Sequence, residues 1–273
     1  MAKTENFKRV VVAVLAIPFI LIASYLGGYY FLLFALIISL AAFYEFSLLV
    51  KNKNVYVNFI IGAIAISALV LNQFFNFIDI EILVVISSLL LLISELFRNK
   101  GSAIYNLGST FLGIFYIGIF SASLIALREF YSSSSEISNQ GAFLVISIFA
   151  SIWVGDSAAY YGGITFGRHK LFARVSPKKS WEGAIFGFIF SVAALILAKV
   201  IVADFLSWID AIMIGIIIGS IGQIGDLVES LIKRDAESKD SSSLIPGHGG
   251  FFDRFDSLLF SAPAIWLYLK FLS

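Results

Sequence analysis

Ionisable residues interrupt an apolar run near the C-terminus, where charged side chains are costly unless they serve a purpose. The residues are spaced i, i+3, i+4 and i+7, which on a helix is one face: Asp226, Glu229, Ser230 and Lys233. An acid in such a run normally faces a partner or a wet cavity. Asp226 has no basic residue at i±4, so we expect it to be functional. For Glu229, a structural pair with Lys233 at i+4 and a functional role both stay open.

The next apolar run begins with two more acids on one face, Asp253 and Asp256, followed by Ser257. Two helices meeting there would present at least three carboxylates to one cleft. Carboxylate oxygens without a set of His or Cys suit Mg²⁺, which also binds substrate phosphates. The pattern therefore predicts a magnesium site formed by Asp226, Asp253 and Asp256. N-terminal capping of the helix is the alternative for Asp253 and Asp256.

A glycine-rich turn, Pro246-Gly-His-Gly-Gly, lies between these two runs. Its glycines could expose backbone N–H groups as an anion-binding nest: Gly247, Gly249 and Gly250. The position before a helix N-terminus, with Lys239 and Arg254 nearby, favours phosphate binding. His248 could donate to phosphate, carry a proton or make a structural hydrogen bond.

An earlier polar stretch repeats this combination of acids and bases. Asp156 lies inside an apolar run, and the segment Ser-Pro-Lys-Lys-Ser-Trp-Glu-Gly that follows contains Lys178 and Lys179. These lysines could bind substrate phosphates; contact with anionic lipid head groups is the alternative. Ser176 or Ser180 is expected to cap the next helix.

The rest of the chain has the composition of a membrane protein. Of its 273 residues 59% are hydrophobic and only 14% are charged. The apolar runs are continuous, unlike the alternating strands of a barrel, and predict an all-α polytopic membrane protein with about nine transmembrane helices. The runs are 9–26, 29–50, 55–72, 80–97, 104–128, 142–161, 183–203, 210–232 and 255–271. The first is expected to be a membrane helix rather than a signal peptide, and Gly27-Gly28 after it a tight turn.

Positive charge predicts the orientation of these helices. With a cytosolic N-terminus, all but three of the 19 Lys and Arg residues fall on the cytosolic side. The exceptions are Arg128, Lys199 and Lys270. The C-terminal polar stretch then faces the cytosol, where nucleotides are.

The chemistry is unevenly distributed along the chain. We expect residues 1–130 to be scaffold helices and 140–273 to be the catalytic part. In the first part, Glu45 and Glu95 are expected to pair with Lys51, Lys53 or Arg98 at the cytosolic helix ends. There is no cysteine, which excludes disulfides and thiolate metal sites, and no basic arm or aromatic–basic repeat indicates nucleic acid.

Taken together, these motifs resemble the CDP-diacylglycerol synthase (phosphatidate cytidylyltransferase) family. The run S-x-x-K-R-x4-K-D-x5-P-G-H-G-G-x2-D-R-x-D, from Ser230 to Asp256, is similar to the signature of that family at every fixed position. Companion patterns lie at Asp156–Tyr160, Ser176–Gly183 and Gly225–Ser230. The helices before residue 130 add no diagnostic residues.

The resemblance implies an integral-membrane nucleotidyltransferase that makes CDP-diacylglycerol and pyrophosphate from CTP and phosphatidate with Mg²⁺. It implies catalytic roles for Lys233, Arg234, Lys239, Asp240, His248 and Arg254. It implies substrate binding by Asp156, Lys178, Lys179, Ser230, Gly247, Gly249 and Gly250. Three carboxylates could also bind a second cation, K⁺ or Mg²⁺. The expected location is the inner (cytoplasmic) membrane with a cytosolic active site, and a homodimer is compatible with the resemblance.

Two other functions compete with this one. A CTP-dependent polyprenol kinase would transfer phosphate to an alcohol, and the PGHGG-x2-DR-x-D run favours the synthase over it. An ion-coupled transporter would place its carboxylates at the midplane, whereas these acids cluster at one face. A CDP-alcohol phosphotransferase is disfavoured, since its closely spaced four-Asp pattern is absent from the sequence.

Overall fold

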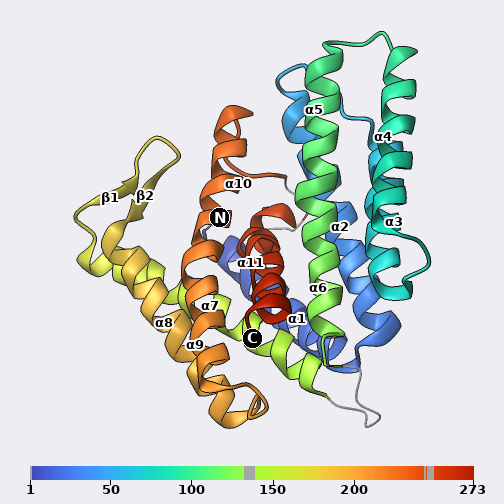
Figure 1. Cartoon of the computed structure of the whole chain (residues 1–273). Helices are drawn as coiled ribbons and strands as arrows, with labels where there is room; N and C mark the ends of the chain where they lie inside the picture. Colours follow the sequence, from blue (N-terminus) through green and yellow to red (C-terminus); the bar gives the residue numbers. More distant parts are fainter. Residues whose placement is uncertain (1, 132–138, 243, 245–248) are drawn as a thin grey trace. The chain divides into compact units, whose positions relative to one another are not determined.

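The computed structural model of the protein describes residues 2–131, 139–242, 244 and 249–273. These are mostly helical, and each of the predicted apolar runs coincides with a helical segment (Figure 1). The predicted positions of the helices are therefore confirmed, and the chain has the character of a multi-pass membrane protein. By length and apolar composition, five helical segments among the described residues could cross a membrane: Gly28–Lys51, Ala103–Arg128, Gln140–Phe166, Trp181–Ile201 and Trp208–Asp235. The count of nine crossings and their orientation stay predictions.

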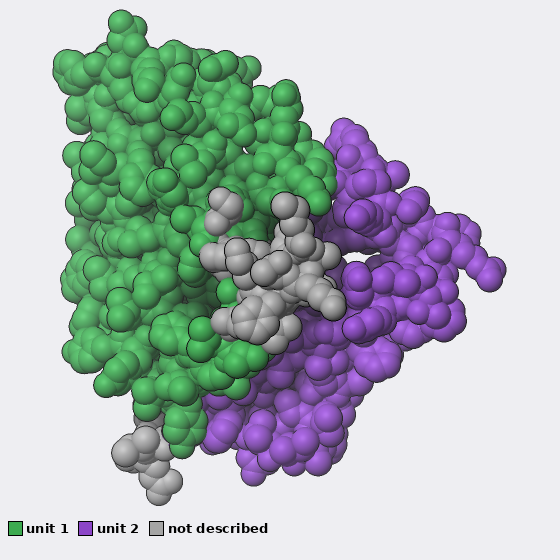
Figure 2. All heavy atoms as spheres, turned by 180° about the vertical axis from the view of Figure 1, so that it is seen from behind, with its two compact units in different colours: residues 1–126, 232–255 green, residues 127–231, 256–273 purple. Residues whose placement is uncertain are grey.

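The chain forms two compact units, coloured separately in Figure 2. Unit 1 comprises Met1–Ala126 and Ile232–Phe255, and unit 2 comprises Leu127–Leu231 and Asp256–Ser273. Helices α10 (Gln223–Asp235) and α11 (Phe252–Phe271) each supply residues to both units. The predicted scaffold and catalytic parts divide the chain by function, so the compact units do not test that division.

Unit 1 is built on apolar helices with polar residues at their ends. Its helices are α1 (Ala2–Leu26), α2 (Gly28–Lys51), α3 (Phe59–Phe75), α4 (Ile80–Leu96), α5 (Ala103–Gly113), the π-helical turn η1 (Ile114–Ile119) and most of α6 (Phe120–Arg128). Gly27 and Gly28 have φ of 61° and 50°, so the predicted tight turn is confirmed and uses a conformation that glycine adopts readily. Asn58 caps α3 by accepting from the Ile61 N–H. Phe31, Phe43 and Phe46 of α2 are buried in its core.

Unit 2 pairs two long helices tightly. It contains α7 (Gln140–Phe166), the strands β1 (Lys170–Phe172) and β2 (Ser176–Ser180), α8 (Trp181–Ile201), α9 (Trp208–Ile217) and the π-helical turn η2 (Ile218–Gly222). Ser151 Oγ donates to the Ser191 carbonyl at 2.7 Å, and Ser191 Oγ returns a bond to Ser151 O at 3.4 Å. Hydrogen bonds of this kind, with small residues, hold α7 and α8 together without charge.

The basic segment before α8 is an antiparallel hairpin, which the sequence did not predict. Lys170 pairs with Ser180 and Phe172 with Ser176, with a register irregularity between them. Ser180 then caps α8 by accepting from the Gly183 N–H at 3.2 Å, as one of the two predicted capping serines. The hairpin therefore runs directly into the first turn of α8, and Lys178 and Lys179 lie on β2.

Candidate active site

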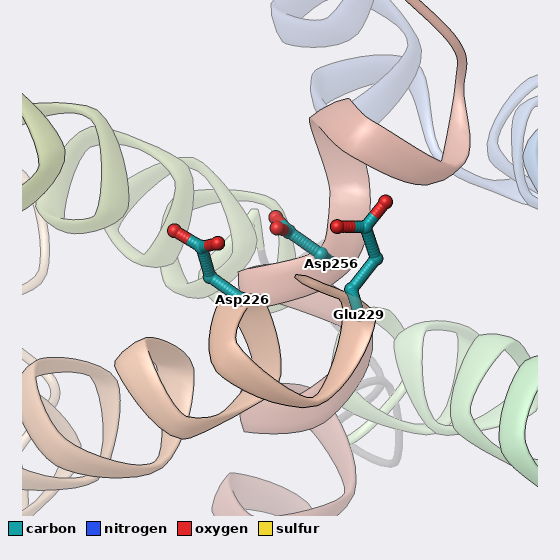
Figure 3. A group of neighbouring side chains, drawn as sticks. All are labelled: Asp226, Glu229 and Asp256. Atoms are coloured by element: carbon teal, nitrogen blue, oxygen red, sulfur yellow. The ribbon is translucent and has the colours of Figure 1, made fainter. Parts of the chain in front are cut away.

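Three carboxylates gather on α10 and α11 within unit 2. Asp226, Glu229 and Asp256 each offer an oxygen within 4.8 Å of the other two. In Figure 3 the carboxyl groups lie on one side of α10, two from α10 itself and one from α11. Glu229 is fully buried. This cluster, Asp226–Glu229–Asp256, is called the acid cluster below.

The close approach of α10 and α11 brings these acids together. A Cβ on Gly225 would lie 2.5 Å from Phe260 Cβ and 2.8 Å from the Asp256 carbonyl oxygen, so only glycine allows this spacing. The turn η2 stands immediately before α10, and π-helical turns of this kind are frequent at functional sites. The helical spacing of Asp226 and Glu229 then places both on the face toward Asp256.

Basic and polar side chains of unit 2 surround the acid cluster. Lys179 Nζ of β2 contacts Asp226 Oδ2, and Ser230 Oγ donates to Asp226 Oδ1 at 3.4 Å. Asp156 of α7, Asp226 and Lys179 are all close enough to Asp256 to act on it electrostatically. The structure therefore joins Asp156, Lys179 and Ser230, predicted from separate motifs, to one site.

The base of the hairpin is fixed by Glu182 at the start of α8. Its carboxylate accepts from the Arg168 N–H at 3.0 Å and from the His169 N–H at 3.3 Å, and lies 2.7 Å from His169 Nδ1. Lys178, next to Lys179 on the same strand, is exposed. One lysine of the predicted pair thus engages the acid cluster, and the other is open to solvent.

Asp253 has different neighbours, which lie in unit 1. Its Oδ1 accepts from Lys233 Nζ at 2.6 Å. Its Oδ2 accepts from the Ser241 N–H at 3.0 Å, from Ser241 Oγ at 2.8 Å and from the Gly250 N–H at 2.9 Å. These four donors all belong to residues that precede α11, so Asp253 connects the start of this helix to the preceding segments. The acid cluster found in unit 2 contains Glu229, which the predicted metal set omitted, and does not include Asp253.

Four other predicted residues of the signature are exposed, Gly249 is half-buried, Gly250 is buried, and two residues lie outside the described chain. Arg234, Lys239, Asp240 and Arg254 are exposed, and Arg234 Nη1 donates to the Ser238 carbonyl at 3.1 Å. Gly249 has a φ of 83°, which favours glycine, and the Gly250 N–H is already bonded to Asp253. Gly247 and His248 lie outside the described residues.

Glu45 of unit 1 makes contacts that the sequence did not predict. We expected it to meet a lysine at the end of its helix, and this is wrong: it accepts hydrogen bonds from residues 241, 242, 251 and 252. Lys53 pairs instead with Glu237 at 2.8 Å, and that hydrogen bond lowers the pKa of Glu237. The signal in the sequence was an acid in an apolar run without a base at i±4, the same criterion that selected Asp226. The companion expectation is confirmed, since Glu95 pairs with Arg98 at 3.2 Å.

An apolar groove lies along α7 and α8 in unit 2. Its volume is about 580 Å³, and its wall is mostly aromatic and aliphatic. The lining residues are Trp153, Val154, Ser157, Ala158, Tyr161, Gly162, Thr165, Phe166, Phe186 and Phe190. Its lining residues Val154 and Ser157 precede and follow Asp156 along α7, so an apolar ligand could lie near the polar site.

Fold and site together are typical of one class of protein: a helical multi-pass membrane enzyme that places a lysine beside several carboxylate oxygens, as enzymes acting on phosphate groups do. The sequence model of the cytidylyltransferase family matches residues 7–272, and the chain belongs to this family. The predicted family is thereby confirmed.

Relatives over most of the chain carry one name. The phosphatidate cytidylyltransferase of Staphylococcus haemolyticus is 32% identical over 261 residues, covering 94% of this chain and 96% of the relative. The phosphatidate cytidylyltransferase of Brucella suis biovar 1 is 31% identical over 265 residues, covering 95% and 92%. That of Synechocystis sp. is 36% identical over 200 residues, covering 65% and 67%.

Proposed function

We propose that the protein transfers the cytidylyl group of CTP to phosphatidate, giving CDP-diacylglycerol and pyrophosphate. The observation that carries this proposal is the acid cluster with Lys179 in contact, together with relatives named phosphatidate cytidylyltransferase. Two polyanions must meet in this reaction, so the main demand is positioning and neutralisation of charge.

The acid cluster fits Mg²⁺. Its donors are all carboxylate oxygens within 4.8 Å of one another, and Mg²⁺ prefers such ligands. When all are ionised, three carboxylates and the contacting Lys179 leave two negative charges, which one divalent cation would balance. Asp226, Glu229 and Asp256 would hold the ion, and a bound ion would neutralise charge on the phosphates. The contacts of Asp253 favour a positioning role, so we leave it out of this set; a second cation, K⁺ or Mg²⁺, stays a proposal of its own.

The reaction itself needs few special groups. A phosphate oxygen of phosphatidate forms a bond to the α-phosphorus of CTP, the bond between the α-phosphorus and its bridging oxygen to the β-phosphate breaks, and pyrophosphate leaves. The phosphate monoester is largely ionised near neutral pH, so no general base is required. Lys178 and Lys179 would bind a phosphate or the lipid head group. We keep Lys233, Arg234, Lys239 and Arg254 as candidates for the triphosphate and the leaving pyrophosphate.

The lipid substrate accounts for the membrane setting. Phosphatidate lies in the leaflet, and the apolar groove along α7 and α8 offers a path for an acyl chain. The positive charge distribution favours a cytosolic N-terminus and a site on the cytosolic face of the inner membrane, where CTP is present. We also propose a homodimer, and the only support for it is membership of the family.

The test is to locate the label that enters lipid when purified protein is given CTP, phosphatidate and Mg²⁺ in detergent. We expect α-labelled CTP to label a CDP-lipid, with pyrophosphate released. Label from γ-labelled CTP in lipid, with CDP released, would replace this proposal with a lipid kinase. No transfer from either position would reject both enzymes and favour transport.

A further inference from the structure

A single buried carboxylate joins two stretches that flank the glycine-rich turn. Glu45 of α2 has no exposed surface. Its Oε1 accepts from Ser242 Oγ at 2.6 Å and the Phe251 N–H at 2.9 Å. Its Oε2 accepts from Ser241 Oγ at 2.9 Å and the Phe252 N–H at 2.8 Å. Each oxygen therefore holds one hydroxyl from before the turn and one backbone N–H from after it.

The two backbone donors belong to the beginning of α11. The first N–H groups of a helix have no partner inside the helix, and the positive end of its dipole favours an anion there. The sequence predicts a substrate phosphate near this helix end. The Phe251 and Phe252 N–H groups instead donate to Glu45, and the Gly250 N–H donates to Asp253. The N-terminus of α11 is thus filled by carboxylates of the chain itself.

The space around Glu45 is closed. A Cβ on Gly250 would lie 2.0 Å from Ser241 Oγ and 2.2 Å from Glu45 Oε2, so any side chain at this position would displace the carboxylate. The glycine that the sequence suggested for phosphate contact is therefore needed for the packing of Glu45.

The contacts continue from Glu45 to charged residues of the signature. Ser241 Oγ lies 2.9 Å from Glu45 Oε2 and 2.8 Å from Asp253 Oδ2. Its hydroxyl has one proton and can donate to one carboxylate at a time, while the Ser241 N–H donates to Asp253 Oδ2 at 3.0 Å in either case. Asp253 in turn receives Lys233 Nζ at 2.6 Å. The position of Lys233 thus depends, through Asp253 and Ser241, on Glu45.

We propose that Glu45 is a positioning residue for cytidylyl transfer: it holds residues 241–242 and 250–252 together and thereby fixes Asp253 and Lys233. This inference rests on the proposed function for its catalytic part and on the contacts alone for its structural part. It gives α2, one of the apolar N-terminal helices that carry no signature residue, an indirect part in placing Asp253 and Lys233.

The test compares Glu45→Gln with Glu95→Gln. Glutamine keeps the size of the side chain but replaces one oxygen by an N–H₂ group, which would face a backbone N–H donor. Glu95 is the matched control, because it is also buried in unit 1 and accepts from Asn106 Nδ2 at 2.6 Å and from Arg98. Two quantities are measured in detergent: amide hydrogen exchange of residues 249–255, and kcat and KM for CTP and phosphatidate.

We expect Glu45→Gln to raise exchange at residues 249–255 and to lower kcat/KM for CTP by roughly tenfold or more, as the loss of a charged hydrogen bond would. Glu95→Gln should change neither. Unchanged exchange in Glu45→Gln would overturn the inference. So would faster exchange with normal kcat/KM, or equal losses of activity in both variants.

A second variant and the exchange measurement cover the cases in which Glu45→Gln does not fold or the unaltered protein is inactive. If Glu45→Gln does not yield folded protein, Ser242→Ala removes one donor to Glu45 Oε1 and should shift exchange and kcat/KM in the same direction by a smaller amount. If the unaltered protein transfers no cytidylyl group, the proposed function fails, yet the exchange measurement still decides whether Glu45 holds the two stretches together.

Discussion

Asp226 is the residue at which the acidic and basic parts of the site meet. Its two oxygens contact Lys179 and Ser230, and it lies within the acid cluster with Glu229 and Asp256. An ammonium in this position can balance the acids and contact a substrate phosphate on the same side. Lys179 is therefore the basic residue whose role can be tested most cleanly.

Replacing Lys179 by Met should raise KM for CTP or for phosphatidate by roughly tenfold, the scale of a lost hydrogen bond to a charged group. Steady-state kinetics with each substrate varied in turn would measure it. Lys170→Met is the control, since Lys170 is an exposed residue of the same hairpin. Unchanged KM values for both substrates would show that Lys179 has only a structural part.

Residue spacing predicted part of this site. The i, i+3 relation of Asp226 and Glu229 and the acids of the next run correctly located the acids on α10 and α11. Spacing could not tell which acid of α11 joins them, because Asp253 and Asp256 differ by one helical turn and only their neighbours separate them. Glu45 could not be assigned either, since Ser241 is 196 residues away and nothing local indicates that contact.

At the scale of elements, the approach of α10 to α11 determines whether the acids form one cluster. Gly225 permits that approach, and the π-helical turn η2 precedes it. The hairpin β1–β2 then brings Lys179 to Asp226 from a separate part of the chain.

Gly225→Ala should therefore separate the helices. Its Cβ would meet Phe260 and the backbone of Asp256, and a displacement of about 1 Å at a reacting centre can cost roughly 10²-fold in rate. Gly108→Ala is the matched control, because a Cβ on this α5 glycine meets nothing within 4 Å. Turnover is measured for both variants at equal amounts of folded protein and should fall for Gly225→Ala and not for Gly108→Ala. The same turnover in both variants would contradict the role given to Gly225.

Helices were predictable because long apolar runs and capping residues are local signals. The Gly27-Gly28 turn and the Ser180 cap were both identified in this way. The hairpin was missed since strands of three and five residues, one of them Ser-Pro-Lys-Lys-Ser, have neither alternation nor strong β-propensity. The π-helical turns η1 and η2 have no sequence pattern that distinguishes them from continuous α-helix.

For the whole molecule, transfer from cytosolic CTP requires the polar segments of the site to lie on the cytosolic face of the membrane. The charge distribution predicts that residues 51–54 lie in the cytosol and residues 202–207 on the opposite side. The chain has no cysteine, so single introduced cysteines can report this directly.

We expect a membrane-impermeant maleimide to label Asp204→Cys in intact cells and Lys51→Cys only after permeabilisation. Both side chains are exposed. Labelling is measured as a mass shift of the purified protein. The reverse pattern would show that the topology is inverted. Labelling of both cysteines in intact cells would show that positions 51 and 204 lie on the same side of the membrane, which contradicts the predicted odd number of crossings between them.

The central claim is that the acid cluster serves cytidylyl transfer from CTP to phosphatidate. The most direct measurement is the initial rate of label transfer from α-labelled CTP to phosphatidate over a range of Mg²⁺ concentrations, for the unaltered protein, Asp256→Asn and Asp204→Asn. The account predicts Mg²⁺-dependent formation of CDP-lipid by the unaltered protein and by Asp204→Asn, and a rate lower by about 10²–10³-fold for folded Asp256→Asn. Full transfer by Asp256→Asn at the same Mg²⁺ concentrations would contradict it.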